Sequence, residues 1–128
     1  MAKYLGIDYG KKRVGVAVSD EDGNLAFPHS VINHSPNLED DIVNIFEEKK
    51  IDKIVIGESK NFKGEPNEIM GEIEKLKKRL EERTKTEVVL EPEFMTSQQA
   101  KRLQGENQMH DASSAAIILQ SYLDKRKN

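Results

Sequence analysis

Two short apolar segments set the strongest limit on how this chain can fold. Asp52–Gly57 (DKIVIG) and Glu87–Leu90 (EVVL) are apolar without alternation, as is typical of strands covered on both faces. Each follows a stretch of helical spacing, and a strand that follows a helix is generally a parallel addition to the sheet. The pattern therefore predicts an α/β protein with two parallel strands in its second half.

The first part of the chain has apolar residues at every second position instead. Residues 3–8 and 14–19 alternate in this way, and a third strand is expected near Leu25–Ile32, after a turn. In the first strand Leu5 and Ile7 point to one face, while Gly6 and Asp8 point to the other. The three strands predict an antiparallel meander. The expected fold is a mixed five-stranded sheet, three antiparallel strands plus two parallel, flanked by helices.

Polar residues and prolines predict where the helices begin. Ser35 and Pro36 suit the N-cap and first position of one helix, and Pro66 opens a second. Thr96 and Gln99 form a capping-box pattern before a short third helix. A final helix is expected over Asp111–Asp124. The length suits a single domain covering residues 1–128.

Composition restricts the chemistry available. The chain has no cysteine and only three well-separated histidines, so a bound metal would be held mainly by carboxylates, which favours Mg²⁺ or Mn²⁺. No apolar run is long enough for a membrane span and the first residues do not resemble a signal peptide, so the expected compartment is the cytoplasm. The net charge of −3 argues against a surface that binds nucleic acid everywhere, but it is compatible with a local basic face.

Asp8 is unusual because it lies inside a predicted strand. Aspartate is disfavoured there, and burying an unpaired carboxylate costs several kcal/mol, so a bound cation is the leading candidate to compensate it. A strand carboxylate holding divalent ions is suited to phosphodiester cleavage. The alternative is a carboxylate that caps the following turn or pairs with Lys11 or Lys12.

Other acids could complete such a site. Glu91 and Glu93 follow the buried strand EVVL on one face, at the end where α/β sheets bind ligands. Spacing does not choose between them, and both also fit solvated loop positions. Asp111 opens the final helix, where it would suit an N-cap. The small residues that follow it, 112–116, would let this helix end approach the sheet so that Asp111 could join Asp8.

Two groups of cations are candidates for contacts with phosphate. Lys11, Lys12 and Arg13 lie beside Asp8 and could guide phosphates, or they could be a plain charge cluster in a hairpin turn. The cations within Lys75–Arg79 (KLKKR) fit a solvated helix face better.

The two ends of the chain resemble one known family. Leu5–Asp20 (LGIDYGKKRVGVAVSD) is similar to the opening of the YqgF family of Holliday-junction-resolvase-like proteins, which are also described as nucleases of pre-16S ribosomal RNA. Asp111–Leu123 (DASSAAIILQSYL) resembles the last helix of that family. Between them, Val55–Gly57 with Asn61 resembles its central strand and loop.

The resemblance implies a ribonuclease-H-like fold and a nuclease that depends on Mg²⁺ or Mn²⁺. The family's acidic positions fall on Asp8, Glu93 and Asp111, which gives Glu93 preference over Glu91. Lys11, Lys12, Arg13 and Asn61 become the expected nucleic-acid contacts. The chain departs from the family beside Glu93, where Pro92 and Phe94 replace an acid and a base.

The implied activity is cleavage that processes the 5′ end of pre-16S ribosomal RNA, in a monomer or a homodimer with nucleic acid as partner and no membrane. The alternatives are a resolvase of branched DNA and a non-catalytic RNA-binding remnant. A phosphotransferase is a further alternative, because Gly6–Gly10 (GIDYG) is also similar to the phosphate-binding strand of sugar kinases, but those proteins close two such domains around ATP.

Overall fold

The computed structural model describes residues 2–58, 69–92 and 108–126, with side chains from residue 112 onward in the last segment. Within these ranges five strands form one sheet in the order β3-β2-β1-β4-β5. The strands are β1 Tyr4–Asp8, β2 Arg13–Ser19, β3 Ala26–Asn33, β4 Lys53–Glu58 and β5 Val88–Pro92, and the helices are α1 Leu38–Glu48, α2 Ile69–Thr84 and α4 Gln108–Arg126.

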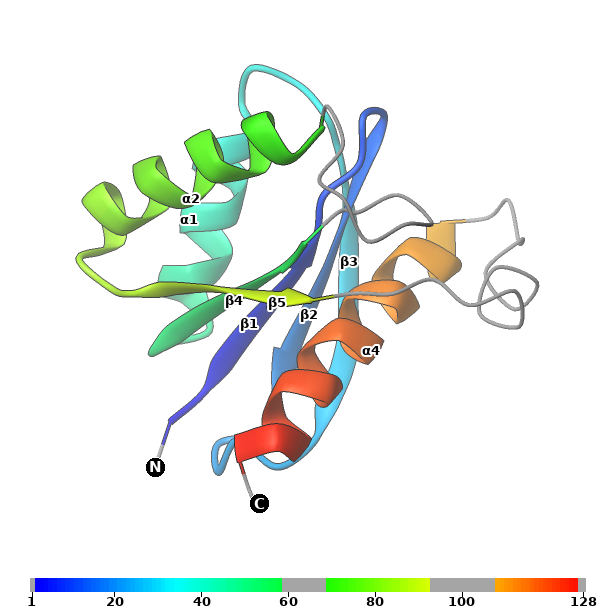
Figure 1. Ribbon diagram of the computed structural model, residues 1–128, viewed down its shortest axis with the longest axis vertical. Helices are drawn as coiled ribbons and strands as arrows, with labels where there is room; N and C mark the ends of the chain where they lie inside the picture. The colour runs from blue at the N-terminus through cyan, green and yellow to red at the C-terminus, as the bar shows by residue number, and fades with distance from the viewer. Residues whose placement is uncertain (1, 59–68, 93–107, 127–128) are drawn as a thin grey trace.

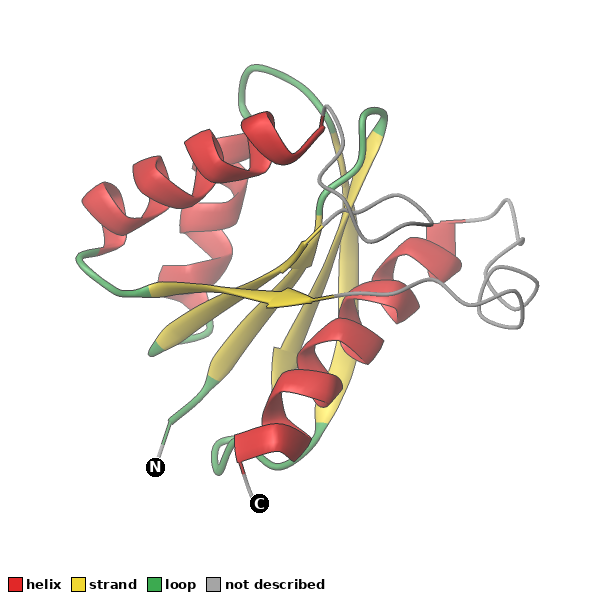
Figure 2. Cartoon of the chain, viewed as in Figure 1, coloured by secondary structure: helices red, strands yellow, loops and turns green. Residues whose placement is uncertain are grey.

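The predicted fold class is confirmed. β1, β2 and β3 pair antiparallel, and β4 and β5 add to β1 in parallel. Figure 1 shows α1 and α2 on one face of the sheet and α4 on the other, and Figure 2 shows the strands forming the layer between them. None of the helices in the described segments is long and apolar enough to cross a membrane.

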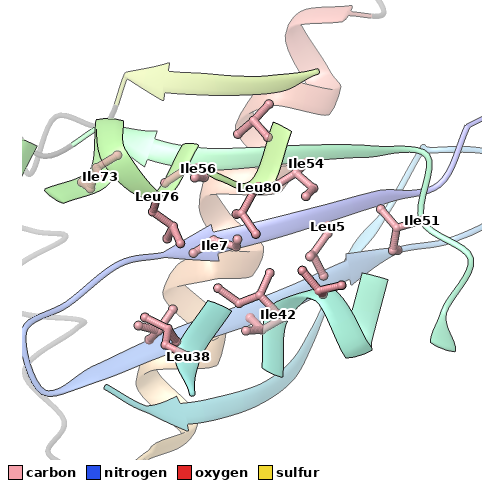
Figure 3. Close-up of a cluster of buried hydrophobic side chains, with 14 of the residues drawn as sticks. Leu5, Ile7, Leu38, Ile42, Ile51, Ile54, Ile56, Ile73, Leu76 and Leu80 are labelled. Atoms are coloured by element: carbon pink, nitrogen blue, oxygen red, sulfur yellow. The ribbon is translucent and has the colours of Figure 1, made fainter. Parts of the chain in front are cut away.

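The larger part of the core lies between the sheet and the helices α1 and α2. Leu5 and Ile7 of β1 are fully buried there, as the alternation predicted, and Figure 3 shows them beneath Ile42 of α1 and Leu80 of α2. Burying each such side chain contributes about 1.5–3 kcal/mol relative to leaving it exposed. Because this face takes the odd residues of β1, the even residues point toward α4.

The second part of the core lies under α4 and depends on small side chains. Ala115 and Leu119 of α4 are fully buried against β1 and β4. A Cβ atom on Gly6 would lie 2.7 Å from Cβ of Leu119 and 3.1 Å from the carbonyl oxygen of Ala115. Glycine at this position is therefore what lets the helix approach the strand so closely.

Two predicted helix starts are wrong. The first helix begins at Leu38, with Asn37 at the N-cap position, because residues 35–37 form a turn in which Ser35 Oγ accepts a hydrogen bond from the Asn37 amide. The last helix begins at Gln108, so Asp111 lies inside it and does not cap it. The predicted starts at Pro66 and Thr96 lie outside the described residues.

Candidate nuclease site

Asp8 is the last residue of β1 and is partly buried on the face of the sheet that α4 covers. Its partner in β2 is Gly15. On the other side, Ile7 pairs with Ile56, so continuing the register by one residue places Gly57 of β4 beside Asp8. Laterally paired residues share a face. The Asp8 carboxylate thus has a glycine on each neighbouring strand, where any other residue would place a side chain next to it.

The helix α4 runs antiparallel to β1 over the face of the sheet on which Gly15, Asp8 and Gly57 lie side by side. The rings of Tyr4 and Tyr122 lie 5.8 Å apart, whereas Gly6, further along β1, lies against Ala115 and Leu119. Two strand residues advance about 6.6 Å and four helix residues about 6 Å. The backbone of α4 opposite Asp8 is therefore about one turn before the pair Ala115 and Leu119, within residues 111–115.

The predicted basic turn lies at the same edge of the sheet. Lys11 and Lys12 are exposed in the turn that joins β1 to β2, and Arg13 is the first residue of β2 and half-buried. The carbonyl of Lys12 accepts a hydrogen bond of 3.0 Å from the His34 amide, and Nδ1 of His34 lies 3.0 Å from the carbonyl oxygen of Gly10. These bonds tie the turn to the end of β3 and place its cations near Asp8.

Glu91 is not the solvated loop acid that its position suggested. It lies within β5, with only 3% of its surface exposed. Its Oε2 accepts a hydrogen bond from the Ser121 hydroxyl at 2.9 Å and forms an ion pair with Nζ of Lys125 at 2.7 Å. This carboxylate therefore fastens β5 to the second half of α4 and is satisfied there.

The predicted set of three acids is only partly within the described structure. Glu93 and Asn61 lie outside the described residues, and of Asp111 only the helical backbone is described. Among the described side chains no group of three histidine or acidic residues could hold a metal ion. The assignment of Asp8, Glu93 and Asp111 as ligands stays a prediction.

Sequence reasoning missed a polar network near Asp8, on the opposite face of the sheet, which α1 and α2 cover. The Tyr9 hydroxyl lies 3.2 Å from Nε2 of His34 and donates a hydrogen bond of 3.4 Å to Glu72 of α2. Burial raises the pKa of Tyr9, and the negative charge of Glu72 raises it further. The hydroxyl is therefore protonated at neutral pH. The only sequence signal for this network was that Tyr9 directly follows Asp8.

Comparison with known proteins identifies the family of the chain. The family model for RuvX, described as Holliday junction resolvase, matches residues 2–125. A protein of Nitratidesulfovibrio vulgaris named "Putative pre-16S rRNA nuclease" is 32% identical over 97% of this chain and 85% of its own length. A protein of the same name from Caldanaerobacter subterraneus is 33% identical over 98% of this chain and 99% of its own length.

Solved structures match the fold. RuvC of Thermus thermophilus in complex with Holliday junction substrate superposes with a TM-score of 0.66 at 17% identity, covering 98% of this chain and 96% of that one. The fowlpox virus Holliday junction resolvase gives 0.61 at 13% identity, covering 97% and 99%. Fold and family together define a nuclease with the ribonuclease-H-like architecture of the resolvases. Within that class, the chain belongs to the RuvX family, also called YqgF.

Proposed function

We propose that this protein is a divalent-metal-dependent endonuclease that processes the 5′ end of pre-16S ribosomal RNA in the cytoplasm. Asp8, Glu93 and Asp111 are its metal ligands and catalytic carboxylates in this proposal. The observation that carries it is the position of Asp8, at the carboxyl end of β1, between Gly15 and the register position of Gly57, and below the first half of α4.

The surroundings of Asp8 fit a hydrated divalent ion. The flanking glycines add no side chain of their own beside the carboxylate, and Ala112 and Ala115 on the overlying helix are buried and small. Oxygen ligands without thiolate or clustered imidazole favour Mg²⁺ or Mn²⁺. When bound, such ions act as Lewis acids in phosphodiester hydrolysis. In this proposal the end of β1 carries Asp8 and the first half of α4 carries Asp111.

The names of the relatives support precursor ribosomal RNA as the substrate. A four-way DNA junction is the second candidate, favoured by the family description and by the fold shared with RuvC. The test is to incubate the purified protein with a pre-16S RNA fragment and with a four-way DNA junction, each with Mg²⁺, Mn²⁺ or chelator. Metal-dependent cleavage of the RNA alone supports the proposal. Cleavage of neither substrate under any of these conditions would favour a non-catalytic RNA-binding role.

The first prediction concerns how an acidic protein holds a polyanion. Replacing Lys11 and Lys12 together with alanine should weaken RNA binding and flatten its dependence on salt by about 1.4 to 1.8 in the logarithmic slope, since each neutralised phosphate contributes about 0.7–0.9. Filter binding across a salt titration measures both quantities. The matched control replaces Lys3 and Lys53, at the opposite edge of the sheet, and should change neither. Equal slopes for wild type and the Lys11/Lys12 variant would place the interface elsewhere.

A second prediction distinguishes the role of Glu91, in β5, from that of Glu93, which follows the strand. Glu93→Gln should reduce cleavage at least about a hundredfold, which corresponds to 2.7 kcal/mol of transition-state stabilisation, with little change in melting temperature. Glu91→Gln should do the reverse, because it removes the charge that pairs with Lys125 and costs about 1–2 kcal/mol of stability. Melting curves and initial cleavage rates on both variants measure this. A larger rate loss for Glu91→Gln would mean that Glu93 is not the ligand.

A further inference from the structure

A cavity of about 330 Å³ lies on the α1/α2 face of the sheet, beside the edge that carries Asp8. Within the described residues its wall is formed by Tyr9 after β1, by the connection from β3 to α1 including His34, by the first residues of α1, and by α2. Its volume is at the lower end of the range of about 300–1,000 Å³ usual for small-molecule sites. Asp8, the one expected metal ligand whose side chain is described, does not line it.

The lining combines apolar and aromatic surface with a few polar groups, as is usual for small-molecule sites. Leu38, Leu76 and Pro36 provide an apolar surface, and the rings of Tyr9 and His34 stand edge to face with centroids 5.1 Å apart. Apolar and aromatic walls of this kind accept a flat ring. In RNA recognition, unstacked bases are commonly held against tyrosine and histidine side chains.

The polar part of the lining carries both signs of charge. Glu39 and Glu72 are hydrogen-bond acceptors, and Lys75 and Arg79 of α2 are cations one helical turn apart. Arg79 lies 3.7 Å from Glu39, while Lys75 has no hydrogen-bond or ion-pair partner in the described part of the chain. Carboxylates accept from the amino groups of bases, and a lysine without a partner can bind a phosphate.

From this arrangement we infer that the cavity binds one nucleotide of the substrate strand, with its base between Tyr9 and the apolar wall and its phosphate on Lys75. The inference rests on the proposed nuclease function and adds a second contact to it. Asp8 and Tyr9 are consecutive and point to opposite faces of the sheet. A nucleic-acid strand that crosses the sheet at Asp8 and Tyr9 would therefore place one nucleotide in the cavity and a nearby phosphodiester beside Asp8.

The test uses the full chain in chelator, so it does not depend on cleavage. Amide signals are followed by NMR while AMP, GMP, CMP or UMP is added to roughly 10 mM, enough to detect a dissociation constant of about 1 mM. At least one nucleotide should shift the signals of Tyr9, His34 and Lys75. Lys75→Glu should weaken this binding about tenfold or more, because it removes a charge-assisted contact and adds repulsion. The matched control Lys78→Glu makes the same change on an exposed position of α2 outside the cavity.

Three results would overturn the inference. The first is that no nucleotide shifts the cavity signals, and the second is that inorganic phosphate shifts them as strongly as any nucleotide does. The third comes from a single-stranded RNA bound in chelator: equal affinity for Lys75→Glu and Lys78→Glu would show that the strand does not use the cavity. A protein that binds nucleotides here but cleaves nothing in Mg²⁺ or Mn²⁺ would instead refute the nuclease proposal and leave the cavity assignment standing.

Discussion

Asp8→Asn should lower cleavage of RNA by about a hundred- to a thousandfold, the loss expected when one charged group that stabilises a transition state is removed. The same variant should lose the stabilisation that Mn²⁺ gives the wild type. An ion present at a hundredfold its dissociation constant adds about 2.7 kcal/mol, which for a domain of this size raises the melting temperature by roughly 8–12 °C. Cleavage rates and melting curves with and without Mn²⁺ measure the two effects.

The matched control is Asp22→Asn, the same change of charge at an exposed position in the turn between β2 and β3. It should leave both the rate and the response to Mn²⁺ unchanged. A wild-type melting curve that does not respond to millimolar Mn²⁺ would contradict the metal site.

Gly6→Ala is the second large effect, although it adds only one methyl group. The new Cβ would lie 2.7 Å from Cβ of Leu119, and a Cβ position does not move with the side-chain rotamer, so the backbone of α4 must shift away from β1. Overpacking of this kind costs about 1–3 kcal/mol. Cleavage should fall as well, because the shift separates the first half of α4 from Asp8. Chemical denaturation and cleavage rates on the same preparation measure both.

Gly71→Ala supplies the control for the same chemical change. Apart from the adjoining residues and backbone of α2 itself, no atom of the described residues lies within 4 Å of the Cβ that would be added to Gly71, which is exposed near the start of α2. Alanine in a helix is more favourable than glycine by about 0.5–1 kcal/mol, so this variant should be slightly more stable than the wild type. If Gly6→Ala is as stable as Gly71→Ala, then α4 does not pack against β1 as closely as described.

Local patterns predicted those features that depend on one element and its period. Alternation in residues 3–8 placed Leu5 and Ile7 on one face and Gly6 and Asp8 on the other, and the buried cluster under α1 and α2 confirms this. The small residues after Asp111 predicted a close approach of the last helix to the sheet. Ala115 against Gly6 confirms that approach.

Features that depend on partners far away in the sequence were not predictable in this way. From its local sequence, Glu91 fits a solvated loop acid. Its hydrogen-bond donor Ser121 and its counter-charge Lys125 lie about thirty residues further along the chain, in α4, and local patterns do not reveal them. The cavity beside Tyr9 brings together the residue after β1, the β3–α1 connection with the start of α1, and α2, and no short motif encodes such a meeting. Lys75 and Arg79 fitted a solvated helix face, and their position beside that cavity is visible only in three dimensions.

The position of α4 also determines when the protein can become active during its own synthesis. This helix follows every strand in the sequence, yet it alone among the described elements covers the face formed by Tyr4, Ala17 and Val55. A ribosome adds about 5–20 residues per second, so for several seconds the nascent chain carries Asp8 without the helix that stands opposite it. The proposed site can therefore assemble only after α4 has been synthesised and has packed against β1.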